Sequence, residues 1–104
     1  MARKDRSLEV ALARAALIVA AMRRSLLTYG ELGLAIGLDG VELRNEMPHV
    51  LDELSTECIA NGEPSLAALV VNKSTGEPGA GWQNGRGVTW HESVRQCYNH
   101  WPPV

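Results

Sequence analysis

The residues of this chain that could bind a metal ion are its two cysteines and two of its histidines, Cys58, His91, Cys97 and His100. Structural zinc sites usually take ligands from close pairs such as Cys-x-x-Cys, and the sequence contains no such pair. His91 and Cys97 are six residues apart, which is poor spacing for two ligands on one helix face. We therefore expect no metal and no cofactor, with both cysteines serving as small core residues.

A nucleophile beside a base is not visible in the sequence either. There is no Gly-x-Ser-x-Gly elbow, and neither cysteine lies in a recognisable catalytic motif. The glycines Gly79, Gly81 and Gly85 do not match the dinucleotide-binding fingerprint, and no phosphate-binding Gly-Lys-Ser/Thr run occurs. We expect a protein without catalytic residues, in which the Gly-rich segment 72–87 forms a turn and a wing-like loop.

Nucleic-acid contact is the chemistry that the remaining polar residues suit best. Arg44 and Asn45 lie near the start of an expected helix, and both side chains can read base edges. The rest of that helix would repel phosphates, so only its first turns can approach DNA. We expect its acids to form a solvated face, made of Glu42, Glu46, Asp52, Glu53 and Glu57.

The whole chain limits these possibilities further. Its 104 residues fit one domain, here taken as 8–104 after a flexible basic tail at 1–7. A net charge of −2 argues against a protein that coats nucleic acid by bulk charge. The apolar stretch 15–22 is too short to span a membrane, and two cysteines are too few for a disulfide scaffold, so we expect a cytoplasmic protein. Eight Arg against two Lys indicate a GC-rich bacterium or one of its phages.

Hydrophobic spacing predicts a mainly α fold with a small β element. We expect helices near 8–25, 29–36, 41–60 and 89–100, and a buried strand at 66–71. A second short strand near 79–82 is an alternative to a loop there. In the first helix, Ser7 is the expected cap, and the expected core-facing stripe is Leu8, Leu12, Ala15, Ala16, Val19 and Met22. In the last helix, one apolar face is expected to hold Trp90, Val94, Cys97 and Trp101.

Helix starts and breaks complete the expected pattern. Capping boxes are predicted at Thr28–Glu31, Asp39–Glu42 and Thr89–Glu92. A turn containing Gly37 and Gly40 separates the second and third helices, which is the helix-turn-helix pattern. Pro48 lies inside the third helix and is expected to kink or divide it near Glu46.

The segment from Thr28 to Trp82 resembles the DNA-binding domain of the alkylguanine-DNA alkyltransferases and the alkyltransferase-like proteins. Thr28-Tyr29-Gly30 matches the family's Thr/Ser-Tyr-Gly helix start. With a one-residue insertion in the turn, Glu42-Leu43-Arg44 matches the family's next helix start. The resemblance implies a winged helix-turn-helix, in which Tyr29 turns a nucleotide out of the duplex and Arg44 fills the gap.

The family's reactive run corresponds to Leu-Ala-Ala-Leu-Val-Val at 66–71, where Ala67 replaces the alkyl-accepting Cys and Ala68 the activating His. An alanine methyl is neither nucleophile nor base, so the resemblance implies DNA binding without alkyl transfer. The wing that follows would carry Lys73.

Two functions from different classes follow from these residues. The first is a non-catalytic winged-helix protein that binds duplex DNA through Tyr29, Arg44, Asn45 and Lys73. The second is a protein-interaction module on the same scaffold, for example a small phage-encoded protein that binds and modulates a host protein. The acidic third helix and the lost pocket residues favour the second, and the resemblance favours the first.

Overall fold

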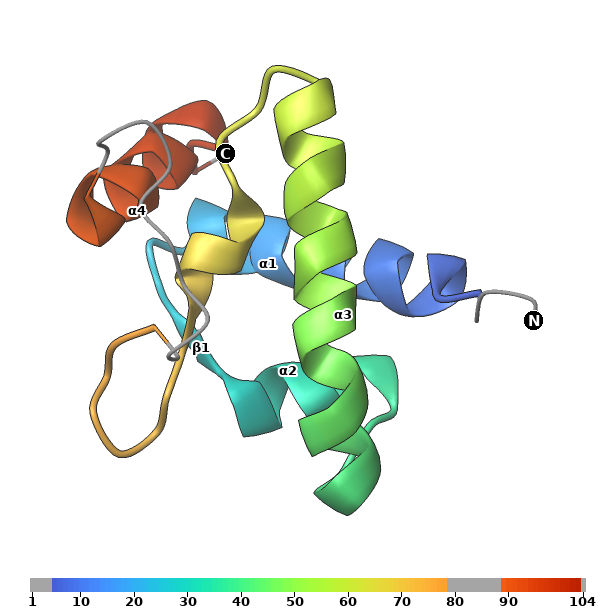
Figure 1. Ribbon diagram of the computed structural model, residues 1–104. Coiled ribbons are helices and arrows are strands. Elements are labelled where there is room, and N and C mark those ends of the chain that lie inside the picture. The colour runs from blue at the N-terminus through green and yellow to red at the C-terminus, as the bar shows by residue number, and fades with distance from the viewer. Residues whose placement is uncertain (1–4, 79–88, 104) are drawn as a thin grey trace.

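The computed structural model describes residues 5–78 and 89–103 (Figure 1). In this part of the chain the fold is mainly helical, with one small two-stranded sheet, as expected. The element order is α1 (Ser7–Met22), β1 (Leu27–Thr28), α2 (Tyr29–Ile36), α3 (Gly40–Ala60), η1 (Leu66–Leu69), β2 (Val70–Val71) and α4 (Trp90–His100). The possible strand near 79–82 lies outside the described residues, as do Gly79, Gly81 and Gly85 of the expected wing.

Helix α1 lies at the centre of the fold and packs against α2, α3, η1 and α4 (Figure 1). The face it buries is Val10, Ala13, Leu17, Ala20 and Ala21, and the alanines allow close packing. The predicted core-facing stripe is therefore wrong, because Leu8, Leu12 and Val19 are 67%, 39% and 53% exposed. Both sides of α1 are apolar, so its hydrophobic spacing could not identify the buried side.

The start of α1 also differs from expectation. Arg6 is the N-cap residue and makes no side-chain capping bond. Asp5 takes over that role, because its Oδ1 accepts hydrogen bonds from Ser7 N at 2.9 Å and from Ser7 Oγ at 2.7 Å. These bonds lower the pKa of the Asp5 carboxyl.

Helix α2 begins and ends as its sequence predicts. Thr28 Oγ1 accepts from Glu31 N at 3.1 Å, while Glu31 Oε1 accepts from Thr28 N at 2.8 Å, which completes the capping box. Gly37 ends the helix at φ 80°, a left-handed conformation that glycine adopts without strain. A tight connection to Gly40 then starts α3.

Helix α3 is a single helix through Pro48, so the predicted division near Glu46 is wrong. Pro48 is exposed, and its ring therefore meets solvent rather than the core. The helix buries Met47, Val50, Leu54 and Cys58 against α1 and η1, and this packing compensates for the backbone bond that proline cannot make. Asp39 makes no side-chain capping bond, so the predicted box at Asp39–Glu42 is absent.

The segment predicted as one strand, 66–71, is mostly a 3-10 turn. Leu66–Leu69 forms η1, and only Val70–Val71 pairs as a strand. Its partner is β1, which was not predicted, and the two strands are parallel with Leu27 opposite Val70 and Thr28 opposite Val71. The run is apolar because all of its residues except Ala67 are buried, which suits a buried turn as well as a buried strand.

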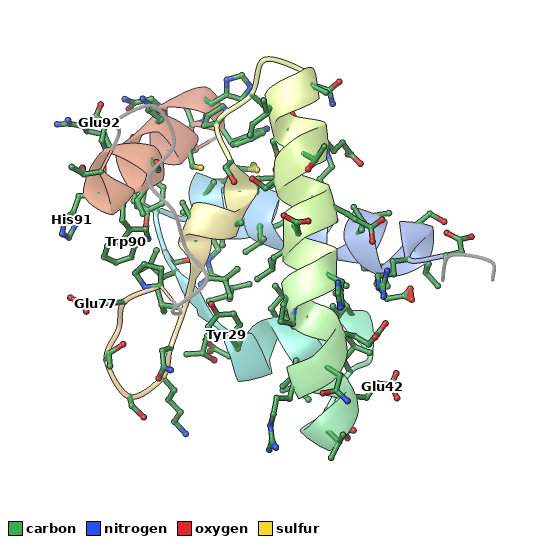
Figure 2. All side chains as sticks on the ribbon, in the orientation of Figure 1. Tyr29, Glu42, Glu77, Trp90, His91 and Glu92 are labelled. Atoms are coloured by element: carbon green, nitrogen blue, oxygen red, sulfur yellow. The ribbon has the colours of Figure 1, made fainter. Side chains whose placement is uncertain are left out.

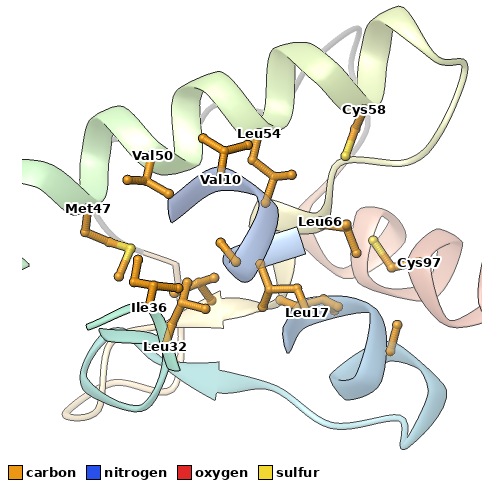
Figure 3. Packing of buried hydrophobic residues seen from close by; sticks show 14 of the residues in the cluster. Val10, Leu17, Leu32, Ile36, Met47, Val50, Leu54, Cys58, Leu66 and Cys97 are labelled. Atoms are coloured by element: carbon orange, nitrogen blue, oxygen red, sulfur yellow. The ribbon is translucent and has the colours of Figure 1, made fainter. Parts of the chain in front are cut away.

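One hydrophobic core joins these elements (Figure 3). Leu17 from α1, Leu32 from α2, Met47 and Leu54 from α3, and Leu66 from η1 are fully buried in it. Helix α4 closes the core as predicted, with Cys97 fully buried and Val94 and Trp101 packed against the cluster. Thr89 Oγ1 accepts from Glu92 N at 3.2 Å, while the Glu92 carboxylate pairs with Arg95.

Candidate nucleic-acid interface

The small sheet brings Tyr29 and Lys73 to one end of the molecule. Tyr29 directly follows β1, and Lys73 lies two residues after β2. Because the two strands are parallel and in register, the chain leaves both strands at the same end of the sheet. Tyr29 is half-buried and packs against the core, while Lys73 is exposed. Figure 2 shows Tyr29 at the start of α2.

Arg44 is exposed in the first turns of α3. It shares a helix face with Leu51 and Ser55, by helical spacing. The Ser55 hydroxyl lies 2.9 Å from the Ser65 hydroxyl, just before η1. Asn45 is also exposed, but adjacent residues point to different sides of a helix. The fold therefore brings Tyr29 and Lys73 to one end of the sheet and leaves Arg44 and Asn45 exposed near the start of α3.

Acidic side chains accompany these cations. Glu42 lies in the first turn of α3, and Glu77 lies on the loop that carries Lys73 (Figure 2). Glu31 is exposed at the start of α2, where its carboxylate is committed to the capping box. Within the described chain this side therefore has no surplus of positive charge, so phosphate contacts are limited to Arg44 and Lys73.

Most acids of α3 face α1 rather than a free surface. Arg6 Nε lies 3.2 Å from Glu46 Oε1, and Arg6 Nη1 lies 3.3 Å from Glu53 Oε2. Arg14 Nη1 lies 3.6 Å from Glu57 Oε1. These pairs are partly buried, and they join α1 to one edge of α3. Arg6, the sixth residue of the expected flexible tail, is thereby placed against α3.

The strongest of these links extends past the end of α3. Arg14 Nη2 donates to Glu63 Oε2 at 2.7 Å, which lowers the pKa of the Glu63 carboxyl and raises the pKa of Arg14. The predicted solvated acidic face is therefore wrong for Glu46 and Glu53, whose side chains are half-buried. It holds for Glu42, Asp52 and Glu57, which are exposed, although Glu57 also pairs with Arg14.

The positions matched to the family's reactive pair carry no reactive group. Ala67 is half-buried and Ala68 is fully buried, both within η1. The Ala68 carbonyl accepts a hydrogen bond from Trp90 Nε1 at 2.7 Å, which fixes η1 to α4. The space beside this turn is thus used for packing between two elements.

Both cysteines are buried core residues, as predicted. Burial raises the pKa of Cys97 to about 12, and it raises the pKa of Cys58 as well. Cys97 Sγ donates to the Ser65 carbonyl at 3.2 Å. Across residues 5–78 and 89–103, no three His, Cys, Asp or Glu side chains gather as metal ligands, and His91 and His100 are exposed.

Sequence reasoning missed the features that hold this side together. The strand β1 is two residues long, which is too short for an alternating pattern to reveal. The links from Arg6 and Arg14 to α3 join residues about 40 or more positions apart, and spacing within one helix cannot predict them. The available signal was Arg14, a charged residue in a largely apolar helix, which could have indicated an ion pair with another element.

No protein-family model matches the chain, and comparisons with curated proteins and with solved structures found no similar protein. The resemblance to the alkyltransferase DNA-binding domain therefore stays a prediction. Among the helices described, none is both long and apolar enough to cross a membrane.

Proposed function

We propose that this protein is a non-catalytic, winged-helix-like DNA-binding protein of the cytoplasm. The observation that supports the proposal is that Tyr29 and Lys73 follow the C-terminal ends of two paired parallel strands, while Arg44 is exposed in the first turns of α3. Tyr29 packs against the core, and Lys73 lies on the exposed loop after β2. The arrangement is compatible with the helix-turn-helix pattern and with the resemblance of the sequence to alkyltransferase-like proteins.

Each residue has a distinct role in this proposal. Lys73 neutralises a phosphate from the loop after β2, and Arg44 enters a groove from the first turns of α3. Tyr29 stacks on a base or sugar, with its ring held at the start of α2 by core packing. Asn45 reads a base edge beside Arg44 when that helix end is seated in the groove.

The proposal includes no chemical step. Alkyl transfer needs a thiolate nucleophile, and Ala67 and Ala68 replace the matched Cys and His. The two thiols of the chain are buried elsewhere, between α3, η1 and α4. Binding alone is the expected activity.

A second candidate is a protein-interaction module. Two large apolar side chains near the α2–α3 turn favour it, because Leu34 is 82% exposed and Val41 is 66% exposed. Exposed apolar side chains beside a weakly charged surface suit a protein partner better than phosphates. In this case Leu34→Ser should abolish capture of the partner while Arg44→Ala should not.

Salt dependence of duplex binding tests the DNA proposal. Only about two phosphates can be neutralised from this side, by Arg44 and Lys73, so log affinity should fall with log salt at a slope of roughly −2. Arg44→Ala should weaken binding by about tenfold or more and reduce the slope by about one. Arg95→Ala is the matched control, because it removes the same charge from the exposed face of α4. Absence of binding at low salt, or equal losses in both variants, would overturn the proposal.

A further inference from the structure

The outer face of α1 is an exposed apolar surface, which we call the α1 face. Its members are Leu8, Ala11, Leu12, Ala15 and Val19, all exposed. They recur at helical spacing and form one continuous line along the helix. Glu9 and Arg14 lie off this line, and Arg14 is engaged with Glu57 and Glu63. No other described element covers the α1 face.

A helix that is apolar on both sides is normally buried on both sides. One side of α1 is already in the core through Val10, Ala13 and Leu17. On the other side, Leu8 and Val19 are more than half exposed. Apolar area of this kind on a small domain marks an interaction surface.

We propose that the α1 face binds the α1 face of a second copy of this chain, in an antiparallel two-fold dimer. Asp5 and Glu9 lie at the start of the helix, where Arg6 is already paired with Glu46 and Glu53. The exposed Arg23 and Arg24 follow its last turn. Antiparallel packing places the acids of one copy beside the arginines of the other and also opposes the helix dipoles. Parallel packing would bring like charges together.

The side chains of the α1 face are also self-complementary in that arrangement. With the two-fold axis at Ala15, the small residues meet at the centre and let the backbones approach closely. Leu8 then lies beside Met22 of the partner subunit, and Leu12 lies beside Val19 of the partner subunit. Glu9 and Arg23 lie on the same flank of the helix, so two equivalent Glu9–Arg23 pairs form across the dimer.

A groove lies between the α1 face and α3. It has a volume of about 500 Å³, and its lining includes Ala11, Arg14 and Ala15 of α1. Glu53 and Glu57 of α3 also line it, and they are already paired with Arg6 and Arg14.

The expected dimer is weak. Helix α1 has 16 residues and is about 24 Å long, so the contact falls at the small end of specific interfaces. A dissociation constant in the micromolar range follows, and the DNA proposal does not depend on it. Sedimentation equilibrium of the full chain without DNA, from about 10 μM to about 1 mM, measures it directly.

Wild-type protein should shift from the 11.3 kDa chain mass to twice that mass across this range. Ala15→Glu places two carboxylates at the axis and should weaken the dimer by at least about tenfold. Leu8→Glu is a second variant with the same expected loss. Ala35→Glu is the matched control on the exposed side of α2 and should leave dimerisation intact. Circular dichroism confirms that each variant stays helical.

The rim charges test the antiparallel orientation. Glu9→Arg and Arg23→Glu should each weaken the dimer by about two- to fivefold at low salt, and the double variant should recover it. The proposal is overturned by a monomer at all concentrations, or by a dimer that Ala15→Glu does not change. A monomer that binds anionic lipid vesicles through the α1 face would instead identify a membrane surface as the occupant.

Discussion

At the scale of single residues, the arginines of α1 explain why α3 is so acidic. Arg6 and Arg14 draw Glu46, Glu53 and Glu57 toward α1, and Arg14 also holds Glu63 beyond the end of α3. The acids therefore serve the fold, and they do not by themselves indicate a basic partner.

The Arg14–Glu63 pair should give the protein a defined acid sensitivity. The pKa of Glu63 is lowered in the fold, so the pair stabilises the protein above the ordinary carboxyl pKa and loses this effect as pH falls through the lowered value. Glu63→Gln should lower the free energy of unfolding by about 1 kcal/mol at neutral pH and by less below about pH 4. Urea unfolding across pH measures this difference.

Glu77→Gln is the control for that experiment, because Glu77 lies exposed on the loop after β2. It should change the unfolding free energy little at any pH. A Glu63→Gln protein that follows the wild-type curve throughout would contradict the assigned role of the pair.

The buried thiols should be inert in the folded protein. Burial raises the pKa of Cys97 to about 12 and also raises that of Cys58, and only a thiolate reacts with disulfide reagents. At about pH 8 a chromogenic disulfide reagent should label neither thiol in native protein and both after denaturation. Rapid labelling of either thiol in native protein would contradict the burial of that cysteine.

At the scale of elements, the approach of α3 to α2 depends on one glycine. A Cβ at Gly33 would lie 2.7 Å from the Leu38 carbonyl oxygen and 2.8 Å from Leu43 Cδ1. The carbonyl belongs to the tight turn and cannot move without shifting α3. Gly33 therefore sets the geometry of the α2–turn–α3 unit on which the proposed interface is built.

Gly33→Ala should destabilise the protein by about 1–3 kcal/mol through overpacking. Gly30→Ala is the matched variant in the same helix, where the nearest atom to a new Cβ is Thr28 Oγ1 at 4.0 Å. It should be neutral or stabilising by up to about 1 kcal/mol, because alanine favours helix. Thermal unfolding compares the two, and equal effects would count against the close contact at Gly33.

The features of α2 that depend on neighbouring residues were predicted correctly, and the features of α3 and of the segment 66–71 that depend on distant residues were not. The Thr28 capping box and the Gly37 end of α2 depend on neighbouring residues, and the sequence predicted both correctly. Pro48 was expected to kink or divide α3, and long-range packing keeps it a single helix. The run at 66–71 is apolar in either conformation, and only pairing with the distant β1 limits its strand to Val70–Val71.

The sequence predicted which residues belong to the candidate site, but it did not predict how they are arranged in space. Tyr29, Arg44 and Lys73 were selected from the sequence, and the placement of Tyr29 and Lys73 at one end of the sheet depends on the parallel pairing of β1 and β2. That pairing joins segments more than forty residues apart, so no local pattern could predict it. The exposed α1 face was likewise hidden, because α1 is apolar on two sides.

At the scale of the whole molecule, the two proposed surfaces are separate. The α1 face lies along the outer side of the central helix, whereas the candidate nucleic-acid interface lies at the end of the sheet beside α2 and α3. A two-fold dimer through α1 would present two such interfaces, as dimeric helix-turn-helix proteins do. DNA binding and dimerisation can therefore be tested in separate experiments on the same protein.

The most direct test of DNA binding is an amide chemical-shift titration of labelled protein with a short duplex at low salt. Shifts should concentrate at Tyr29, Arg44, Asn45 and Lys73 and grow in fast exchange, because few phosphate contacts make the complex weak. The same titration at about 200 mM salt should suppress them. A titration without shifts at low salt, or with shifts confined to the α1 face, would contradict DNA binding through the α2–turn–α3 side.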